Sequence, residues 1–466
     1  MSHRKLIVLT ALVVALFAFV YLFERKMPTT EERAQKGDLV WELPEDHIEA
    51  IRLDRPGGVT VELARTGPAS WRLVKPDSYP AESAAVSDLL SQLARLRRAG
   101  GDSSEAKPDD YGLKSPTGKA TITWKDDAKP GKKFSRTLEF GIEIPGTDAT
   151  AARLAGGNSV IFVPTTVAVA ARKAPDDFKT REVFPAGSEA ARLEVERGRG
   201  RLSLAKKDGA WWLRQPLSDL AESGAVDKVI GSLTALKALE FLPAPQGSGL
   251  ASLGLSPPFI HVVLADAKGP GMSVDLGATR SDGNAVYARR ENQVFTVASS
   301  IVEDLSREAE AFREPHLVHF DRSAVTQLDG AFAGGSFALV RKDGGWNLAG
   351  RPLLAPSVDD LLTAILDIKS KAFGDDALAA SLAARQPSAT VTVRLSAGDP
   401  WTVKLYAGGT EARATVSGRP GAFLVAGEPV APLEAAFKKA AAPAPPTSPT
   451  APPPMPSPIP GTPPKK

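Results

Sequence analysis

The chain has 466 residues, 43% of them hydrophobic and 24% charged, with a formal net charge of +3 and no cysteine. These proportions are typical of a globular protein. The small net charge argues against a nucleic-acid-binding protein, which needs a strongly basic domain with interleaved aromatic residues. The lack of cysteine excludes disulfides, thiol catalysis and thiolate metal sites. The length predicts two to four domains.

The N-terminus carries an unbroken apolar run over residues 6–23, with basic residues on both sides. Eighteen helical residues span about 27 Å, enough for a thin bilayer core. Because no small-x-small cleavage pattern follows, residues 1–26 are expected to form a retained transmembrane signal anchor. The flanking charges slightly favour a cytoplasmic N-terminus. The expectation is a single-pass protein of the bacterial inner membrane with a periplasmic body.

Three tryptophans, Trp71, Trp212 and Trp346, occur at similar intervals and in similar settings. Ahead of them, apolar and polar residues alternate, as in residues 51–54 and 59–63, which is typical of half-buried strands. The sequence Lys342-Asp343-Gly344 predicts a hairpin turn into the third tryptophan strand, as Lys207-Asp208-Gly209 does for the second. Each tryptophan is therefore expected to lie in a strand that follows a hairpin.

An amphipathic helix is predicted after each tryptophan strand, because apolar residues recur with a period of about 3.6. These helices cover residues 84–96, 225–239 and 358–368. More strands and a closing helix follow in each copy. The repeated order predicts an α+β fold of three tandem modules, each an antiparallel sheet with helices and its own core. Their expected boundaries are residues 40–184, 185–320 and 321–439.

The first two copies also share a short element, which reads Tyr111-Gly112-Leu113-Lys114-Ser115-Pro116 and Leu253-Gly254-Leu255-Ser256-Pro257. The third copy has only a weak counterpart at Arg385-Gln386-Pro387-Ser388. Together with the Trp-x-Leu-x-x-Pro order and the N-terminal apolar run, this element resembles the bacterial envelope proteins of domain of unknown function 4340 (DUF4340). The resemblance covers most of residues 40–440.

That resemblance implies an N-terminal anchor and an extracytoplasmic body. Many members are encoded beside ABC transporters of the gliding-motility-auxiliary type, which implies a non-catalytic accessory role. No catalytic residues are known for the family, so the resemblance assigns none here.

The C-terminal residues 440–466 are rich in proline and contain little apolar bulk. Such a segment cannot form a core and is expected to be a disordered, polyproline-like tail. One hypothesis is that it binds a groove for Pro-rich ligands or spans the cell wall. The alternative is a solvated tail without a partner.

Few residues suggest chemistry. His316, His319 and Asp321 form the one histidine cluster, but a preceding proline and interleaved apolar residues indicate a connector strand and not a metal site. Residues 112–120 resemble a phosphate loop, yet the spacing is wrong and Ala120 replaces the metal-binding hydroxyl. Paired acidic residues such as Asp176-Asp177 and Asp375-Asp376 are explained by turns and helix starts. We therefore assign no catalytic, metal or cofactor-binding residue.

A tryptophan repeated at one place in each copy most often pins a hairpin onto its own helix, although carbohydrate stacking is the alternative. In the doubled Trp211-Trp212, alternation sends the two rings to opposite faces. The favoured function is a non-enzymatic, membrane-anchored adaptor of an ABC-type export or gliding-motility complex. Its expected partners are the membrane, permease or ATPase subunits and, through the tail, the cell wall. The alternatives are a glycan- or wall-binding module and an unrecognised hydrolase.

Overall fold

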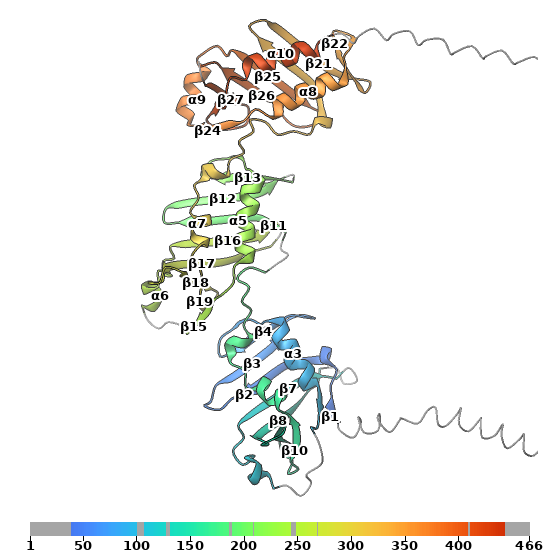
Figure 1. Ribbon diagram of the computed structural model, residues 1–466, viewed down its shortest axis with the longest axis vertical. Coiled ribbons are helices and arrows are strands. Elements are labelled where there is room, and N and C mark those ends of the chain that lie inside the picture. The colour runs from blue at the N-terminus through green and yellow to red at the C-terminus, as the bar shows by residue number, and fades with distance from the viewer. Residues whose placement is uncertain are drawn as a thin grey trace, which may run out of the picture. The chain divides into compact units, whose positions relative to one another are not determined.

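The computed structural model describes residues 39–99, 107–126, 131–185, 189–207, 209–243, 248–267, 269–408 and 411–442 (Figure 1). Its contacts divide the chain into two compact units. Unit 1 comprises residues 1–188, 232–262 and 272–302, and unit 2 comprises residues 189–231, 263–271 and 303–466. Three large antiparallel sheets and one small sheet make up the described part.

The first large sheet lies in unit 1 and has eight strands in the order β10-β9-β8-β7-β2-β3-β4-β5. Alternating residues of its strands are buried, as the period-2 pattern predicts. Its strands are β2 (Ile48–Asp54), β3 (Thr60–Arg65), β4 (Trp71–Lys75), β5 (Tyr79–Pro80), β7 (Gly118–Lys125), β8 (Lys133–Glu143), β9 (Ala149–Leu154) and β10 (Ile161–Pro164).

The second sheet has nine strands in the order β14-β13-β12-β11-β16-β17-β18-β19-β15. Its strands are β11 (Ala190–Arg197), β12 (Gly200–Lys207), β13 (Ala210–Gln215), β14 (Asp219–Leu220), β15 (Glu240–Leu242), β16 (Ile260–Asp266), β17 (Met272–Thr279), β18 (Ala285–Arg290) and β19 (Gln293–Ala298).

The third sheet lies in unit 2 and repeats this order as β23-β22-β21-β20-β25-β26-β27-β28-β24. Its strands are β20 (Val325–Phe332), β21 (Gly335–Lys342), β22 (Gly345–Leu348), β23 (Arg351–Pro352), β24 (Ser370–Gly374), β25 (Ala389–Leu395), β26 (Trp401–Tyr406), β27 (Ala412–Val416) and β28 (Ala422–Val425). The predicted hairpin turn at Asp343-Gly344 is confirmed, with both residues at positive φ and Lys342 paired with Gly345.

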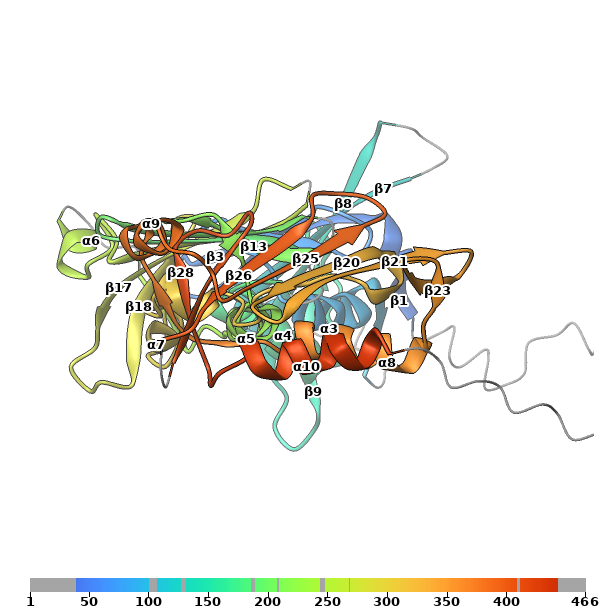
Figure 2. The same ribbon diagram turned by 90° about the horizontal axis from the view of Figure 1, so that it is seen from above.

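The helices are few and short beside these sheets. In Figure 2, α8 and α10 lie along one face of the third sheet, and they contact each other. The α-helices are α3 (Ser83–Ala94), α4 (Thr165–Ala171), α5 (Ser223–Ala235), α6 (Gly249–Ser252), α7 (Ile301–Leu305), α8 (Ala355–Leu366), α9 (Asp376–Ala383) and α10 (Val430–Ala440). The 3-10 turns are η2 (Glu45–His47), η3 (Pro108–Tyr111), η4 (Pro175–Phe178), η5 (Ala309–Phe312) and η6 (Arg322–Ala324), and a two-stranded sheet joins β1 (Leu39–Glu42) to β6 (Arg95–Arg97).

The α+β expectation is wrong, because the described residues fold mainly as four antiparallel sheets. The three predicted amphipathic helices exist as α3, α5 and α8, but each accompanies a sheet of eight or nine strands. Many of those strands have only two to six residues, too few to give a clear periodic signal in the sequence. The predicted module boundaries remain predictions.

The predicted fold also included an N-terminal transmembrane helix, and this part of the prediction is corrected as well. Within the described ranges, no helix is long and apolar enough to cross a bilayer. The predicted span at residues 6–23 lies outside the described residues, as do residues 443–466 of the predicted tail.

The register of the repeated tryptophans differs by one residue from the prediction. Trp71, Trp211 and Trp346 are the equivalent buried residues, each followed two positions later by a leucine on the same face. They are 6%, 1% and 7% exposed, so they are core residues, as the sequence favoured. Trp212 points to the other face and is half-buried, with Arg214 5.7 Å from its ring centroid.

The shared Gly-Leu element forms a close backbone approach in the first two sheets. A Cβ on Gly141 would come within 2.1 Å of the Tyr111 carbonyl oxygen, and one on Gly277 would come equally close to that of Leu253. In the third sheet the corresponding position is Tyr406, which is buried in a small separate apolar cluster. A side chain at this position leaves no room for the close backbone approach, so the third sheet packs a tyrosine there instead.

Candidate functional site

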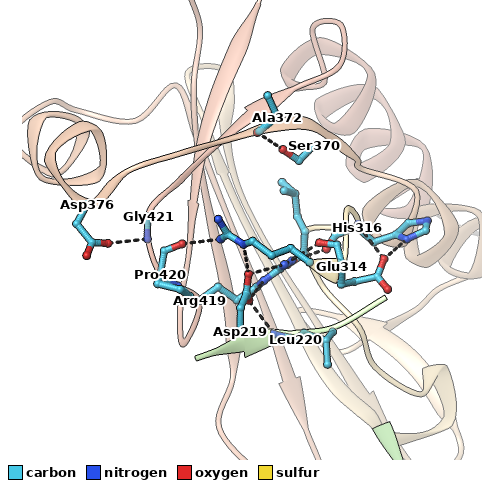
Figure 3. A network of polar contacts seen from close by, with 12 residues as sticks. Asp219, Leu220, Glu314, His316, Ser370, Ala372, Asp376, Arg419, Pro420 and Gly421 are labelled. Atoms are coloured by element: carbon cyan, nitrogen blue, oxygen red, sulfur yellow. Dashed lines mark hydrogen bonds and ion pairs between the residues drawn. The ribbon is translucent and has the colours of Figure 1, made fainter. Parts of the chain in front are cut away.

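Asp219 is the centre of a buried charge cluster in unit 2 (Figure 3). It begins β14 and is 0% exposed. Its Oδ2 accepts a hydrogen bond from Arg313 Nε at 2.6 Å, and its Oδ1 accepts one from Arg419 Nε at 2.7 Å. The Leu220 N–H also donates to Oδ1, at 2.8 Å. One carboxylate therefore holds two buried guanidinium groups.

Backbone carbonyls and aromatic rings complete the surroundings of both arginines. Arg419 donates to the Glu314 carbonyl oxygen at 2.7 Å, and Arg313 donates to that of Pro420 at 2.9 Å. The Arg313 guanidinium carbon lies 4.0 Å from the centroid of the Phe373 ring. A buried cation needs such partners, and charge-assisted hydrogen bonds are about twice as strong as neutral ones.

Unit 1 contains a related arrangement in the turn between β18 and β19. Arg290, 7% exposed, donates to the carbonyl oxygens of Glu182 and Val183 at 3.2 and 3.0 Å. Lys179, 5% exposed, donates to Gln293 Oε1 at 2.6 Å. Arg290 ends β18 at its turn to β19, and Arg419 lies in the equivalent turn between β27 and β28. The second and third sheets thus each use a buried arginine to hold the backbone of the segment that leads into them, here called the first linker (residues 179–185) and the second linker (residues 313–321).

Both linkers are held by isolated pairings beside edge strands. The edge strands next to these pairings are β5 and β15 for the first linker, and β14 and β24 for the second. The paired residues are Ala81 with Lys179, Glu182 with Lys237, Ala221 with Arg313, and His316 with Lys369. The buried arginines and the isolated pairings therefore hold the same two linkers.

A cavity of about 610 Å³ lies beside the Asp219 cluster in unit 2, lined partly by Phe373, Asp375 and Asp376. Asp375 caps α9 by accepting the Leu378 N–H at 2.8 Å. Asp376 accepts the Gly421 N–H at 2.9 Å. Asp375 therefore serves a helix start, as expected, whereas Asp376 holds the turn between β27 and β28.

The histidines singled out in the sequence have separate roles. His316 Nδ1 lies 2.5 Å from Glu314 Oε1 in the second linker. His319 is exposed. Asp321 caps η6 by accepting the Ser323 N–H at 2.8 Å, and this hydrogen bond lowers its pKa. In the described part of the chain, no group of three or more potential metal ligands is assembled.

The segment that resembles a phosphate loop continues from η3 into β7. Gly112 follows η3 with φ +73°, and Leu113 is fully buried. The segment therefore forms a turn and the start of a strand.

Two carboxylate-centred ion clusters, which lie at equivalent positions of the first two sheets, were not anticipated from the sequence. In the first, Glu139 is 6% exposed, and its two oxygens accept from Lys119 Nζ and Arg153 Nε, each at 2.7 Å. Burial raises the pKa of Glu139, but the hydrogen bonds from the two cations outweigh it, so the pKa lies below its ordinary value.

In the second cluster, Asp275 takes the place of Glu139. His261 Nδ1 lies 2.6 Å from Asp275 Oδ1, and Arg289 Nη2 donates to Oδ2 at 2.6 Å. The sequence signal for both clusters was the period-2 alternation of the strands. Once the strand order is known, this alternation places the carboxylate and its two partners on one face of the sheet. The recurrence in two sheets favours a role in stabilising strand pairing.

The fold and these clusters define a protein of repeated antiparallel sheets joined by charge-stabilised linkers. The chain belongs to the family described as Domain of unknown function (DUF4340), whose model matches residues 71–258 and 221–387. This confirms the family that the sequence motifs resembled. No curated protein matches. Among solved structures, a DNA polymerase sliding clamp from Pseudomonas aeruginosa is 6% identical to this chain. The match covers 84% of this chain and 94% of the clamp chain, but its TM-score of 0.13 does not indicate a shared fold.

Proposed function

We propose that this chain is a non-enzymatic envelope protein, an accessory or adaptor subunit of an ABC-type export or gliding-motility-associated complex. The observation that most supports this proposal is that the buried charged side chains bind one another and the backbone of the chain. Asp219, Arg313 and Arg419 contact one another and the linker backbone, so they stabilise the chain's own architecture. Binding to partners would then use the outer surfaces of the three large sheets.

Membership of DUF4340 supports the choice of partner class, through the association with ABC transporters that the resemblance implies. The burial of Trp71, Trp211 and Trp346 favours the adaptor over the glycan-binding alternative, because stacking on sugars requires an accessible ring face.

The test is a crosslinked pull-down of the tagged full chain from cells. We expect permease or ATPase subunits to be recovered, and to be recovered equally by an Asp329→Asn variant, which alters a partly exposed side chain that pairs with Arg394 and accepts hydrogen bonds from Gln327. Recovery of wall material alone would contradict the proposal. So would a hydrolytic turnover of the purified chain that His261→Ala abolishes, because His261 Nδ1 lies 2.6 Å from Asp275 Oδ1, a histidine–carboxylate contact of the kind that a hydrolase uses.

A further inference from the structure

Arg290 is a buried cation of unit 1 that forms no ion pair with a carboxylate of the described residues. Its Nη1 donates to the carbonyl oxygens of Glu182 and Val183. Its Nε is buried without a hydrogen-bond partner, and its Nη2 makes no hydrogen bond within the described ranges. Arginine is rarely buried without a paired charge, because burying an unpaired charge costs free energy. A negative charge beside Arg290 would therefore stabilise it.

The equivalent arginine in unit 2 has such a charge, because Arg419 Nε donates to Asp219 Oδ1 at 2.7 Å. Asp219 of β14 pairs with Leu213, and Tyr79 of β5 pairs in the same way with Leu73. Tyr79 is fully buried, and this burial raises the pKa of its hydroxyl, which is therefore uncharged at neutral pH. In unit 1, a neutral tyrosine thus stands where unit 2 has the carboxylate.

A cavity of about 480 Å³ in unit 1 is lined by Arg290 and by the residues at which α3 begins. Arg72 also lines this cavity, where its Nε donates to Ser78 Oγ at 2.8 Å and its Nη2 pairs with Glu291. Hydroxyl groups contribute further donors from Thr66, Ser70 and Ser83. The cavity therefore brings two guanidinium groups, several hydroxyl groups and a helix start together, and its size suits a small ligand.

The start of α3 lacks the acceptor that the start of α5 has. The first N–H groups of a helix have no acceptor within the helix, and the helix dipole favours an anion beside them. In α5, the Glu222 carboxylate accepts the N–H groups of Gly224 and Ala225 at 3.1 and 2.7 Å. The corresponding Glu82 makes no such side-chain bond to α3. An external anion can therefore reach the N–H groups of α3.

We propose that this cavity binds a phosphate group, which accepts hydrogen bonds from the Ser83 N–H and from the guanidinium groups of Arg290 and Arg72. The phosphate supplies the negative charge that Asp219 supplies to Arg419. A tetrahedral oxyanion suits these donors, because its oxygens point in several directions and because helix starts and arginines are common phosphate ligands. This site is separate from the adaptor function and does not depend on it.

Two carboxylates line the same cavity and limit its affinity for an anion. Glu182 accepts a hydrogen bond from Lys237 Nζ at 3.1 Å, so its charge is balanced. Glu82 forms no ion pair within the described part of the chain. Because like charges repel, Glu82→Gln should bind phosphate at least about threefold more tightly than the wild-type chain.

Isothermal titration calorimetry of the purified full chain with inorganic phosphate, at constant ionic strength, tests the proposal. We expect a dissociation constant of about 1 mM or lower. Arg290 also holds the first linker, so Ser83→Pro is the better variant. It removes the N–H and the hydroxyl at the start of α3 and should weaken binding at least about fivefold. Proline suits the first position of a helix, and the φ of −73° and ψ of 112° at Glu82 suit a residue before proline.

The matched control is Ser223→Pro at the start of α5, where Glu222 already accepts the N–H groups, and it should bind phosphate like the wild-type chain. Circular dichroism without phosphate checks that both proline variants are folded. Glycerol 3-phosphate distinguishes the sources of the group: tighter binding than inorganic phosphate indicates a monoester of a larger molecule, and equal binding indicates free phosphate. Both results support the site.

Three results would overturn the proposal. The first is no binding of inorganic phosphate up to about 10 mM. The second is a folded Ser83→Pro variant that binds as tightly as the wild-type chain, or no more weakly than Ser223→Pro. The third is an affinity that Glu82→Gln leaves unchanged, because this carboxylate lines the proposed site.

Discussion

Replacing Asp219 with asparagine should destabilise unit 2 strongly. The substitution keeps the volume and one acceptor but removes the charge that Arg313 and Arg419 share. The side chains of these arginines are only 4% and 1% exposed, so water cannot replace the lost carboxylate. Breaking a buried ion pair from one side costs about 3–5 kcal/mol. Because asparagine retains one hydrogen bond, we expect the lower end, about 3 kcal/mol.

Urea unfolding followed by circular dichroism measures this loss as a lower midpoint of unfolding. The matched control is Asp329→Asn, whose ion pair with Arg394 is 3.4 Å long and partly exposed, and which should cost less than about 1 kcal/mol. In an Asp219→Asn/Arg419→Met double variant, the loss should be smaller than the sum of the two single losses. Equal, small losses for Asp219→Asn and Asp329→Asn would refute the reasoning, because they would show that water reaches the cluster.

Three further predictions concern the sheets. Trp211→Ala should cost about 3–5 kcal/mol and Trp212→Ala less than about 1 kcal/mol, and similar losses in urea unfolding would contradict the register found here. Glu139→Gln should destabilise the chain at pH 7. Because the pKa of Glu139 is lowered by folding, its contribution is present above its unfolded pKa and is lost as pH falls through the folded value, so wild-type and variant stabilities should converge in acid. A variant penalty that stays constant down to pH 3 would argue against this. Gly277→Ala should destabilise strongly, because its Cβ would meet a backbone carbonyl oxygen at 2.1 Å, whereas the helical Gly231→Ala, with nothing within 4 Å, should be neutral or stabilising; thermal unfolding compares them.

The sequence alone predicted several strands, helices and turns, because each of these depends on residues that are close together along the chain. Alternation predicted the strands that precede each tryptophan, and the 3.6 period predicted α3, α5 and α8. Positive φ at Asp343 and Gly344 follows from local turn chemistry. The short motifs were sufficient to suggest the DUF4340 family, which the family model confirms.

Other features were decided only by tertiary structure. Alternation shows that Trp211 and Trp212 face opposite sides, but it cannot say which side is the core, because a shift of one residue exchanges the two faces. Strands of two to six residues give too weak a signal, so the sequence underestimated the sheets. The Asp219 cluster joins residues 94 and 200 positions apart. No periodicity links such residues; they meet because the edge of one sheet, a linker and the turn of the next sheet fold together, and only burial makes their charges depend on one another.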